Sequence, residues 1–290
     1  MTTKRENGIG LFQELVAGEN SQDYDRMYSV YAPEMAIYLN GEVFYAGKPE
    51  VIRDWEKQHT PTIYGDSHRD VQWIDATDNR VTAQYTVAFD HNGEVFGLPA
   101  TGNRVEFHGV AIAEHDGEKV QVLRLFADQG EMNRQLSGEV REPGTASAAR
   151  VAPPVPENER ARYEVVGERL IRTAYDAENE RDIEKQLACY ADPLLDHFAG
   201  RAKALPLSVA RDALPAWWAS LPGLHRDIEE VLALGDRAVL RWHLTAEPLH
   251  GQPVSQHGCS VIEHDGERIR KFWTYYADVA ALYPAIRELD

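Results

Sequence analysis

The sequence predicts an α+β fold that occurs twice in one chain, as two tandem cone-shaped barrels with helices packed on a curved antiparallel sheet. Three observations predict it. A segment of about 130 residues is repeated, each copy begins with apolar residues at helical spacing, and each copy ends with strands of alternating polarity. A length of 290 residues agrees with two domains, because a domain typically has roughly 100–200 residues.

The repeat consists of short identical segments at nearly constant offsets. Residues 114–118 (EHDGE) recur at 263–267, which is 149 residues later. Residues 68–70 (HRD) recur at 225–227, which is 157 residues later. The difference between the offsets corresponds to about eight additional residues in the first copy, an ordinary difference in loop length. The repeat unit is therefore a whole domain rather than a solenoid repeat.

The segment between the copies contains prolines and many small residues, and its apolar residues show no periodicity. This composition is typical of an interdomain linker. We therefore predict a first domain at residues 1–137, a linker at 138–157 and a second domain at 158–290.

The elements of the first copy follow from its residue pattern. Leu11, Phe12 and Leu15 have the spacing of one helix face, and Ser21 can cap a second helix that extends to about residue 32. The later elements are a strand at 36–39, a helix that carries Trp55, and strands at 71–75, 81–89, 104–114 and 119–127. In the four strands after that helix, the period of the apolar residues falls to about two.

The second copy repeats this order. Its predicted elements are helices near 165–174 and 183–190, a strand at 194–198, a helix that carries Trp217 and Trp218, and strands at 228–234, 238–246, 254–263 and 268–276. Asp-Gly pairs at 116–117 and 265–266 favour a tight type I′ hairpin before each last strand. A curved sheet closed by helices encloses a cone-shaped pocket, so we expect a buried small ligand.

Several motifs of both copies are shared with a known family. Residues 97–102 (GLPATG) and 105–109 (VEFHG) precede the 116–117 hairpin, and Asp128 follows the last strand. The second copy keeps His257-Gly258, Asp265-Gly266, Trp273 and Asp278, and has residues 250–253 (HGQP) where the first has a Pro-x-Thr-Gly turn. In these features the chain resembles the SnoaL-like polyketide cyclase family, with the ketosteroid-isomerase or nuclear-transport-factor-2-like fold.

The resemblance implies a small-molecule cavity into which a polar residue of the third meander strand, His108 or His257, points. It also implies that the usual cyclase carries an acidic residue on its last strand, where an apolar cone would raise its pKa and let it move a proton. Neither residues 119–127 nor residues 268–276 contain Asp or Glu. The Arg-x-Asp arrangement of a limonene-type epoxide hydrolase is also absent from these strands.

The candidate catalytic residues are groups that can exchange a proton near neutral pH: His257, His243, Asp196 and His108. A His257–Asp196 pair across the pocket would supply a base and an orienting carboxylate, and the alternative for the histidines is a structural role. Glu34 and Asp54 are expected to be solvated. The candidate substrate-binding residues are polar and aromatic side chains expected near the pockets: His197, Trp217, Trp242, Trp273, Tyr275, Tyr28, Tyr38, Asn40, Trp55 and Tyr85.

Alternation along the strands limits which of these candidates can share a pocket. His243 and Trp242 are adjacent, so they face opposite sides of a sheet and only one can line the cavity. Trp273 and Tyr275 are two residues apart, so they share a face unless a bulge intervenes.

Charge and motif content exclude several function classes. Thirty basic and 47 acidic residues give a net charge of −17, so we expect neither nucleic acid nor a membrane surface as a partner. Two cysteines and eleven scattered histidines predict no disulfide framework and no metal site. The sequence lacks nucleotide-binding glycine motifs, so no cofactor is expected. The N-terminus has no signal-peptide pattern, which indicates a cytoplasmic protein.

The leading hypothesis is a cofactor-independent enzyme of secondary metabolism that carries out a cyclase-type or isomerase-type proton transfer on an apolar, oxygenated, polyketide-like substrate. The alternatives are a small-molecule binding protein without catalysis, or an epoxide hydrolase or dehydratase on the same fold. We also expect the two copies to form an intrachain pseudo-dimer, with further homodimerisation of the chain open.

Overall fold

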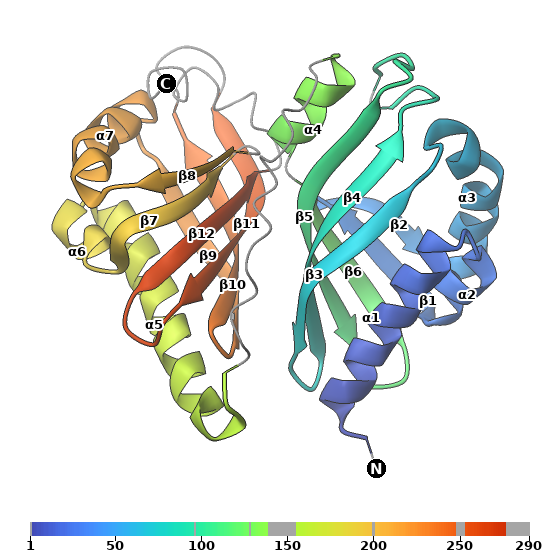
Figure 1. The fold of residues 1–290 in the computed structure, drawn as a ribbon, viewed down its shortest axis with the longest axis horizontal. Coiled ribbons are helices and arrows are strands. Elements are labelled where there is room, and N and C mark those ends of the chain that lie inside the picture. Colours follow the sequence, from blue (N-terminus) through green and yellow to red (C-terminus); the bar gives the residue numbers. More distant parts are fainter. Residues whose placement is uncertain are drawn as a thin grey trace. The chain divides into compact units, whose positions relative to one another are not determined.

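The computed structural model describes residues 2–95, 97–127, 129–138, 155–198, 201–247 and 253–276 (Figure 1). The chain divides into two compact units, Met1–Gly144 and Thr145–Asp290. Most of the predicted linker lies outside the described residues, as do Asp128, Asp278 and the 250–252 segment.

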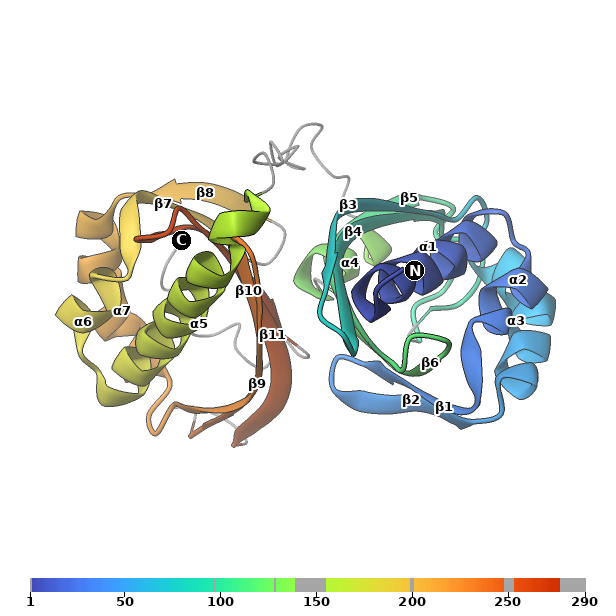
Figure 2. The same cartoon turned by 90° about the horizontal axis from the view of Figure 1, so that it is seen from below.

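The first domain wraps one sheet around its N-terminal helix (Figure 2). Its elements are α1 (Lys4–Asn20), α2 (Tyr24–Ser29), β1 (Tyr31–Leu39), β2 (Glu42–Gly47), α3 (Pro49–Ile63), β3 (His68–Ala76), β4 (Arg80–Asp90), β5 (Arg104–His115), β6 (Val120–Ala127) and α4 (Gln129–Leu136). The strand order is β2-β1-β6-β5-β4-β3. Only the β1–β6 pair of this described sheet is parallel.

The second domain has the same order of strands and helices. Its elements are α5 (Glu157–Glu180), α6 (Ile183–Leu187), β7 (Tyr190–Phe198), β8 (Arg201–Leu205), α7 (Leu207–Ser220), β9 (His225–Leu234), β10 (Arg237–Ala246), β11 (Val254–His264) and β12 (Ile269–Tyr276). The sheet runs β8-β7-β12-β11-β10-β9, which matches the first domain strand for strand. The predicted α+β fold with two tandem copies is therefore confirmed.

Two strands, β2 and β8, were not expected from the sequence. In the first domain Asn40 and Gly41 have φ values of 49° and 89°, which turn the chain from β1 into β2. This Asn-Gly pair is a strong hairpin signal, because both residues of a type I′ turn need positive φ. The predicted hairpin at Asp116 is present, but Asp116 accepts hydrogen bonds from the backbone of Glu118 and Lys119 through its side chain. Of that pair, only Gly117 has positive φ, at 99°, so the turn is not type I′.

The helix that opens each domain is held close to the sheet by a glycine. A Cβ atom on Gly8 of α1 would lie 2.3 Å from the His115 ring, and one on Gly167 of α5 would lie 2.7 Å from the His264 ring. Burial lowers the pKa of His115 and of His264. Both histidines belong to the repeated EHDGE segment, and both are buried beneath the helix.

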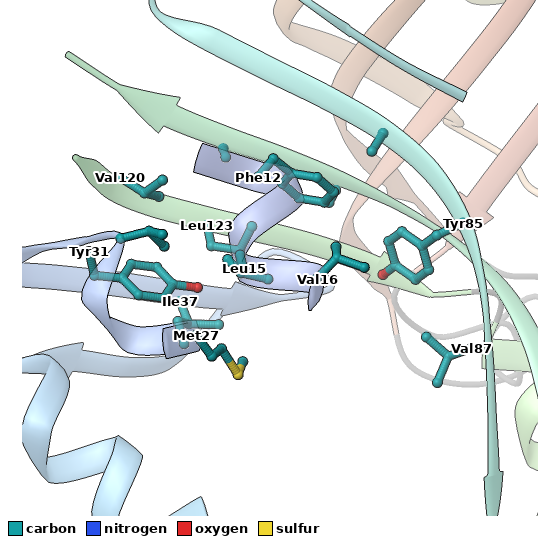
Figure 3. Packing of buried hydrophobic residues seen from close by; sticks show 14 of the residues in the cluster. Phe12, Leu15, Val16, Met27, Tyr31, Ile37, Tyr85, Val87, Val120 and Leu123 are labelled. Carbon is teal, nitrogen blue, oxygen red and sulfur yellow. The ribbon is translucent and has the colours of Figure 1, made fainter. Parts of the chain in front are cut away.

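The interior of the first domain is built from α1 and the facing strands. Phe12, Leu15 and Val16 point toward side chains of β1, β4 and β6, including Ile37 and Tyr85 (Figure 3). Phe12 and Leu15 belong to the face predicted from helical spacing, whereas the predicted Leu11 is only partly buried. Burying such a face is the main stabilising contribution to a helix of this length.

The repeated His-Gly motif is explained by its glycine. A Cβ on Gly109 would lie 2.6 Å from the Tyr85 ring, and a Cβ on Gly258 would lie 2.1 Å from the Trp242 ring. The aromatic ring of the neighbouring strand therefore lies directly on the glycine in both domains. The register does not shift at either glycine, so the motif marks a close contact rather than a bulge.

Replacing Gly258 with Ala (G258A) should destabilise the protein by about 1–3 kcal/mol, because overpacking forces neighbouring groups out of place. Trp242 is fully buried and its indole N–H donates to Ser260 Oγ at 3.0 Å, so the ring cannot retreat. Chemical denaturation measures the change. The matched control is Gly10→Ala in α1, where the added Cβ meets nothing within 4 Å, and it should be neutral or stabilising. Equal stability of G258A and G10A would contradict the contact.

Candidate active sites

Cavity 1 is the hollow of the first domain, with a volume of about 260 Å³. It is bounded by α1, α2, α3 and the inner face of the sheet, and its walls are mostly apolar. Its lining includes Phe12, Met27, Ile37, Phe89 and Phe107. The polar groups among these apolar walls are few, so each can orient a ligand.

Glu56 is the acidic group of cavity 1 whose pKa is most changed. It lies on α3 between Ile52 and Thr60, at intervals of four residues that place all three on one helix face. Burial raises the pKa of Glu56 to about 7, and Glu19 adds to the rise, whereas Tyr28 and Arg69 oppose it. A carboxyl group with this pKa can give or take a proton at neutral pH.

A buried ion pair lies beside Glu56. Arg69 Nε and Nη2 donate to the two carboxylate oxygens of Glu19 at 2.6 and 2.9 Å, and the guanidinium lies 4.1 Å from the Tyr85 ring centre. Asn20 exchanges two hydrogen bonds with the Arg69 backbone, at 2.7 and 2.8 Å. The pair joins α1 to β3 and gives cavity 1 a rigid charged wall.

Two tyrosines add hydroxyl groups to the same cavity. The hydroxyl of Tyr31 is buried and has no hydrogen-bond partner within the described part of the chain, whereas the Tyr28 hydroxyl interacts with the Glu56 carboxyl group. Burial raises the pKa of both, so both stay protonated at neutral pH. A buried polar group without a partner costs about 1–3 kcal/mol, which a ligand oxygen in the cavity would offset.

Cavity 2 is the corresponding hollow of the second domain, with a volume of about 220 Å³. Arg226 Nη1 donates to Glu178 Oε2 at 2.5 Å, and Nη2 donates to the Tyr276 hydroxyl at 2.6 Å. Asn179 holds the Arg226 backbone through two hydrogen bonds of 2.9 Å. The ion pair of cavity 1 is therefore repeated in cavity 2.

Asp196 is a second acidic residue that lines cavity 2, in addition to Glu178. It lies on β7, opposite Phe272 of β12, and lines the cavity. Burial raises the pKa of Asp196 to about 6, although the backbone of His197 and the charge of Lys203 oppose the rise. Asp196 therefore gives cavity 2 a proton-transfer group of its own.

Five of the residues predicted from the sequence line a cavity. They are Tyr28, Asn40 and Tyr85 in cavity 1, and Asp196 and Trp217 in cavity 2. Trp242 lies on the inner face as well, but is fully buried against Arg226, 4.8 Å from its guanidinium.

The three candidate histidines lie on the face of the sheet opposite the cavities. Phe107 lines cavity 1, so the adjacent His108 points away from it. His243 and His257 are cross-strand neighbours with rings 4.9 Å apart, and His257 Nδ1 lies 2.9 Å from Glu229. The expectation that these histidines point into a cavity is wrong, and His257 cannot face Asp196 across the pocket.

The remaining candidates also lie away from the cavities. Trp273 and Tyr275 share a face as expected, but Phe272, Thr274 and Tyr276 are the residues of β12 that line cavity 2. The others make contacts elsewhere: His197 stacks on Trp273 at 4.8 Å, Tyr38 lies under Arg124 at 4.2 Å, and Trp55 is 44% exposed and stacks on His59.

The sequence contained signals for the residues that were missed. Glu56 interrupts an apolar stripe on a helix, which marks a polar group facing the interior. Residues 19–23 (ENSQD) recur as 178–182 (ENERD) at an offset of 159, and this repeat contains both glutamates of the buried ion pairs. The arginines belong to the His-Arg-Asp motif that recurs at residues 68–70 and 225–227.

Family comparisons assign both domains to related families. Residues 10–136 match the SnoaL-like polyketide cyclase family, and residues 171–272 match the SnoaL-like domain family. No curated protein matches the chain. Similar solved structures each align with about one domain of this chain.

Three of these structures are AclR, IdmH and an epoxide hydrolase. AclR from Streptomyces galilaeus, a candidate hydroxylase, is 21% identical, with a TM-score of 0.40, over 47% of this chain and 99% of its own. IdmH from Streptomyces antibioticus, a candidate polyketide cyclase, is 21% identical, with a TM-score of 0.39, over 45% and 98%. An LEH-like epoxide hydrolase of M. tuberculosis is 16% identical, with a TM-score of 0.39, over 47% and 89%.

Two further findings concern membranes and metals. Within the described ranges, no helix combines the length and apolar character needed to cross a membrane. The described side chains also include no group of three or more His, Cys, Asp or Glu arranged to hold a metal ion.

Proposed function

Because residues 10–136 match the SnoaL-like polyketide cyclase family and residues 171–272 match the SnoaL-like domain family, we propose that the chain is a cofactor-independent enzyme that moves a proton within an apolar, oxygenated small molecule. The reaction would be of the cyclase or isomerase type, on a polyketide-like substrate of secondary metabolism in the cytoplasm. The observation that carries the proposal is Glu56, a carboxyl group with a pKa of about 7 in a cavity with largely apolar walls.

The proposed reaction uses Glu56 as base and then as acid. The ionised carboxylate removes a proton from a carbon next to a substrate carbonyl, and the electron pair moves onto the carbonyl oxygen as an enolate. The Tyr31 hydroxyl, which has no partner among the described residues, donates a hydrogen bond to that oxygen. Glu56 then returns the proton to the same or another carbon, which completes exchange or isomerisation.

Asp196 supports the same class of chemistry in cavity 2. It is the one catalytic candidate from the sequence that lines a cavity, and its raised pKa suits proton transfer. The intrachain pseudo-dimer of the two domains and homodimerisation of the chain stay predictions.

Proton exchange in D₂O tests the proposal without knowledge of the natural substrate. The probe is 2-tetralone, an apolar enolisable ketone, and NMR follows the loss of its α-proton signals. A carboxylate base is active above its pKa, so the catalysed rate should rise from low pH in steps near 6 and 7 and then level off. Binding of the ketone with exchange no faster than in buffer would favour a binding protein instead.

A further inference from the structure

The two cavities share one framework but differ at several lining positions. The framework is the Glu–Arg pair, with an aromatic side chain stacked between its arginine and a glycine. An offset of 159 residues, the same as between the two glutamates, equates Met27 with Gln186 and Ile37 with Asp196. Figure 3 shows Met27 and Ile37 within the interior of the first domain.

Another of these differences lies on the helix that covers each cavity. Helices α3 and α7 begin 158 residues apart, at Pro49 and Leu207. This offset equates Glu56 with Leu214, and both line their cavities. Cavity 1 thus has its extra carboxyl group on the α3 wall, whereas cavity 2 has its extra polar groups on α6 and β7. The polar groups therefore lie on different walls in the two cavities.

Gln186 is the most informative of these residues. Only 7% of the residue is exposed, and it lines cavity 2. Its Oε1 has no hydrogen-bond partner among the residues that the structure describes. An acceptor left without a donor in a cavity indicates a ligand that supplies one.

Asp196 adds a second acceptor to cavity 2. At neutral pH its carboxyl group is mostly ionised, because a pKa of about 6 lies below pH 7. An ionised carboxylate accepts hydrogen bonds only. Gln186 and Asp196 thus give cavity 2 two acceptors at positions where cavity 1 has the apolar Met27 and Ile37.

We propose that cavity 2 is a separate ligand site, which takes an apolar ring compound carrying a hydroxyl group, and that this hydroxyl donates its one hydrogen bond to Gln186 Oε1, with Asp196 as a further acceptor of the same cavity. Cavity 1 accommodates a carbonyl compound, so the chain carries two sites of different selectivity. This inference concerns binding alone. Its failure would leave proton transfer in cavity 1 standing, and failure of proton transfer would leave this inference standing.

Calorimetric titration of the full chain tests the inference with two matched probes. The probes are 2-naphthol, which has a hydroxyl donor, and 2-methoxynaphthalene, which has the same rings and no donor. Wild type should bind 2-naphthol on the order of 10-fold more tightly. The variant Gln186→Met (Q186M), which gives cavity 2 the residue of cavity 1, should reduce the preference to about one-fold to twofold. Met27→Leu (M27L), at the equivalent position of cavity 1, should keep it.

A second variant covers the case in which Q186M does not fold, as judged by circular dichroism. Leu214→Phe (L214F) fills cavity 2 and leaves Gln186 in place, and it should also remove the preference for 2-naphthol. Equal affinity of wild type for the two probes, or no binding of 2-naphthol up to its solubility, would overturn the proposal. An unchanged preference in folded Q186M, or in L214F where Q186M is unfolded, would also overturn it.

Discussion

Replacing Glu56 with Gln (E56Q) should slow α-proton exchange of 2-tetralone in cavity 1 by about 100- to 10,000-fold, the usual contribution of a positioned general base. The amide has nearly the shape of the carboxyl group but cannot take a proton at neutral pH. The comparison is made in an Asp196→Asn background, so that cavity 2 does not contribute to the rate. The step near pH 7 should disappear together with the activity.

The matched control for E56Q is Asp54→Asn, two residues earlier on the same helix. The Asp54 side chain is 65% exposed and pairs with Arg53 at the surface. This variant should keep the exchange rate and its pH dependence. If E56Q and D54N lose the same activity, or if neither does, Glu56 is not the base.

Replacing Arg226 with Met (R226M) should destabilise the second domain by about 3–5 kcal/mol, because the change leaves an uncompensated buried charge. Both side chains of the Glu178–Arg226 pair are 6% exposed, so solvent cannot replace the lost partner. Arg226 is also surrounded by the rings of Tyr175, Trp242 and Tyr276, within 5.7 Å. Urea denaturation measures the loss in free energy of unfolding.

A double variant separates two contributions to the free energy of unfolding: the cost of leaving Glu178 charged without a partner, and the net contribution of the Glu178–Arg226 pair. Glu178→Leu combined with R226M removes both charges and should recover much of the stability, since buried ion pairs often contribute little net free energy. The exposed pair between Glu168 and Arg172 provides the surface control, and Arg172→Met should cost less than about 1 kcal/mol. A double variant as unstable as R226M would show that the rings, rather than the charge, determine the loss.

The fold could be predicted from the sequence because its signals are local or repeated. Phe12 and Leu15 are buried, as helical spacing predicts, and the segments with a period of two form paired strands. The repeated EHDGE segment joins the last two strands in both domains. The two copies also support each other, because an element with a weak pattern in one copy can be predicted from the corresponding segment of the other. The Asn40-Gly41 turn shows that even β2 had a local signal.

The site could be predicted only in part because strand alternation fixes which residues share a face, but not which face is inward. Trp273 and Tyr275 were placed together correctly, yet they lie on the side away from cavity 2. The inward face is selected by packing against α5 and by bulges such as the one between Arg241 and Trp242. These depend on contacts between residues far apart in the chain.

The parallel pairs β1–β6 and β7–β12 have a consequence for synthesis on the ribosome. In each domain the last strand to be made lies between the first strand and the rest of the sheet. The β2–β1 hairpin therefore has no neighbour in the sheet until Val120–Ala127 has emerged, and cavity 1 has no complete wall before then. Such long-range pairing is intrinsically slow. The first domain can nevertheless fold while the second is still being translated, so the two domains can fold one after the other.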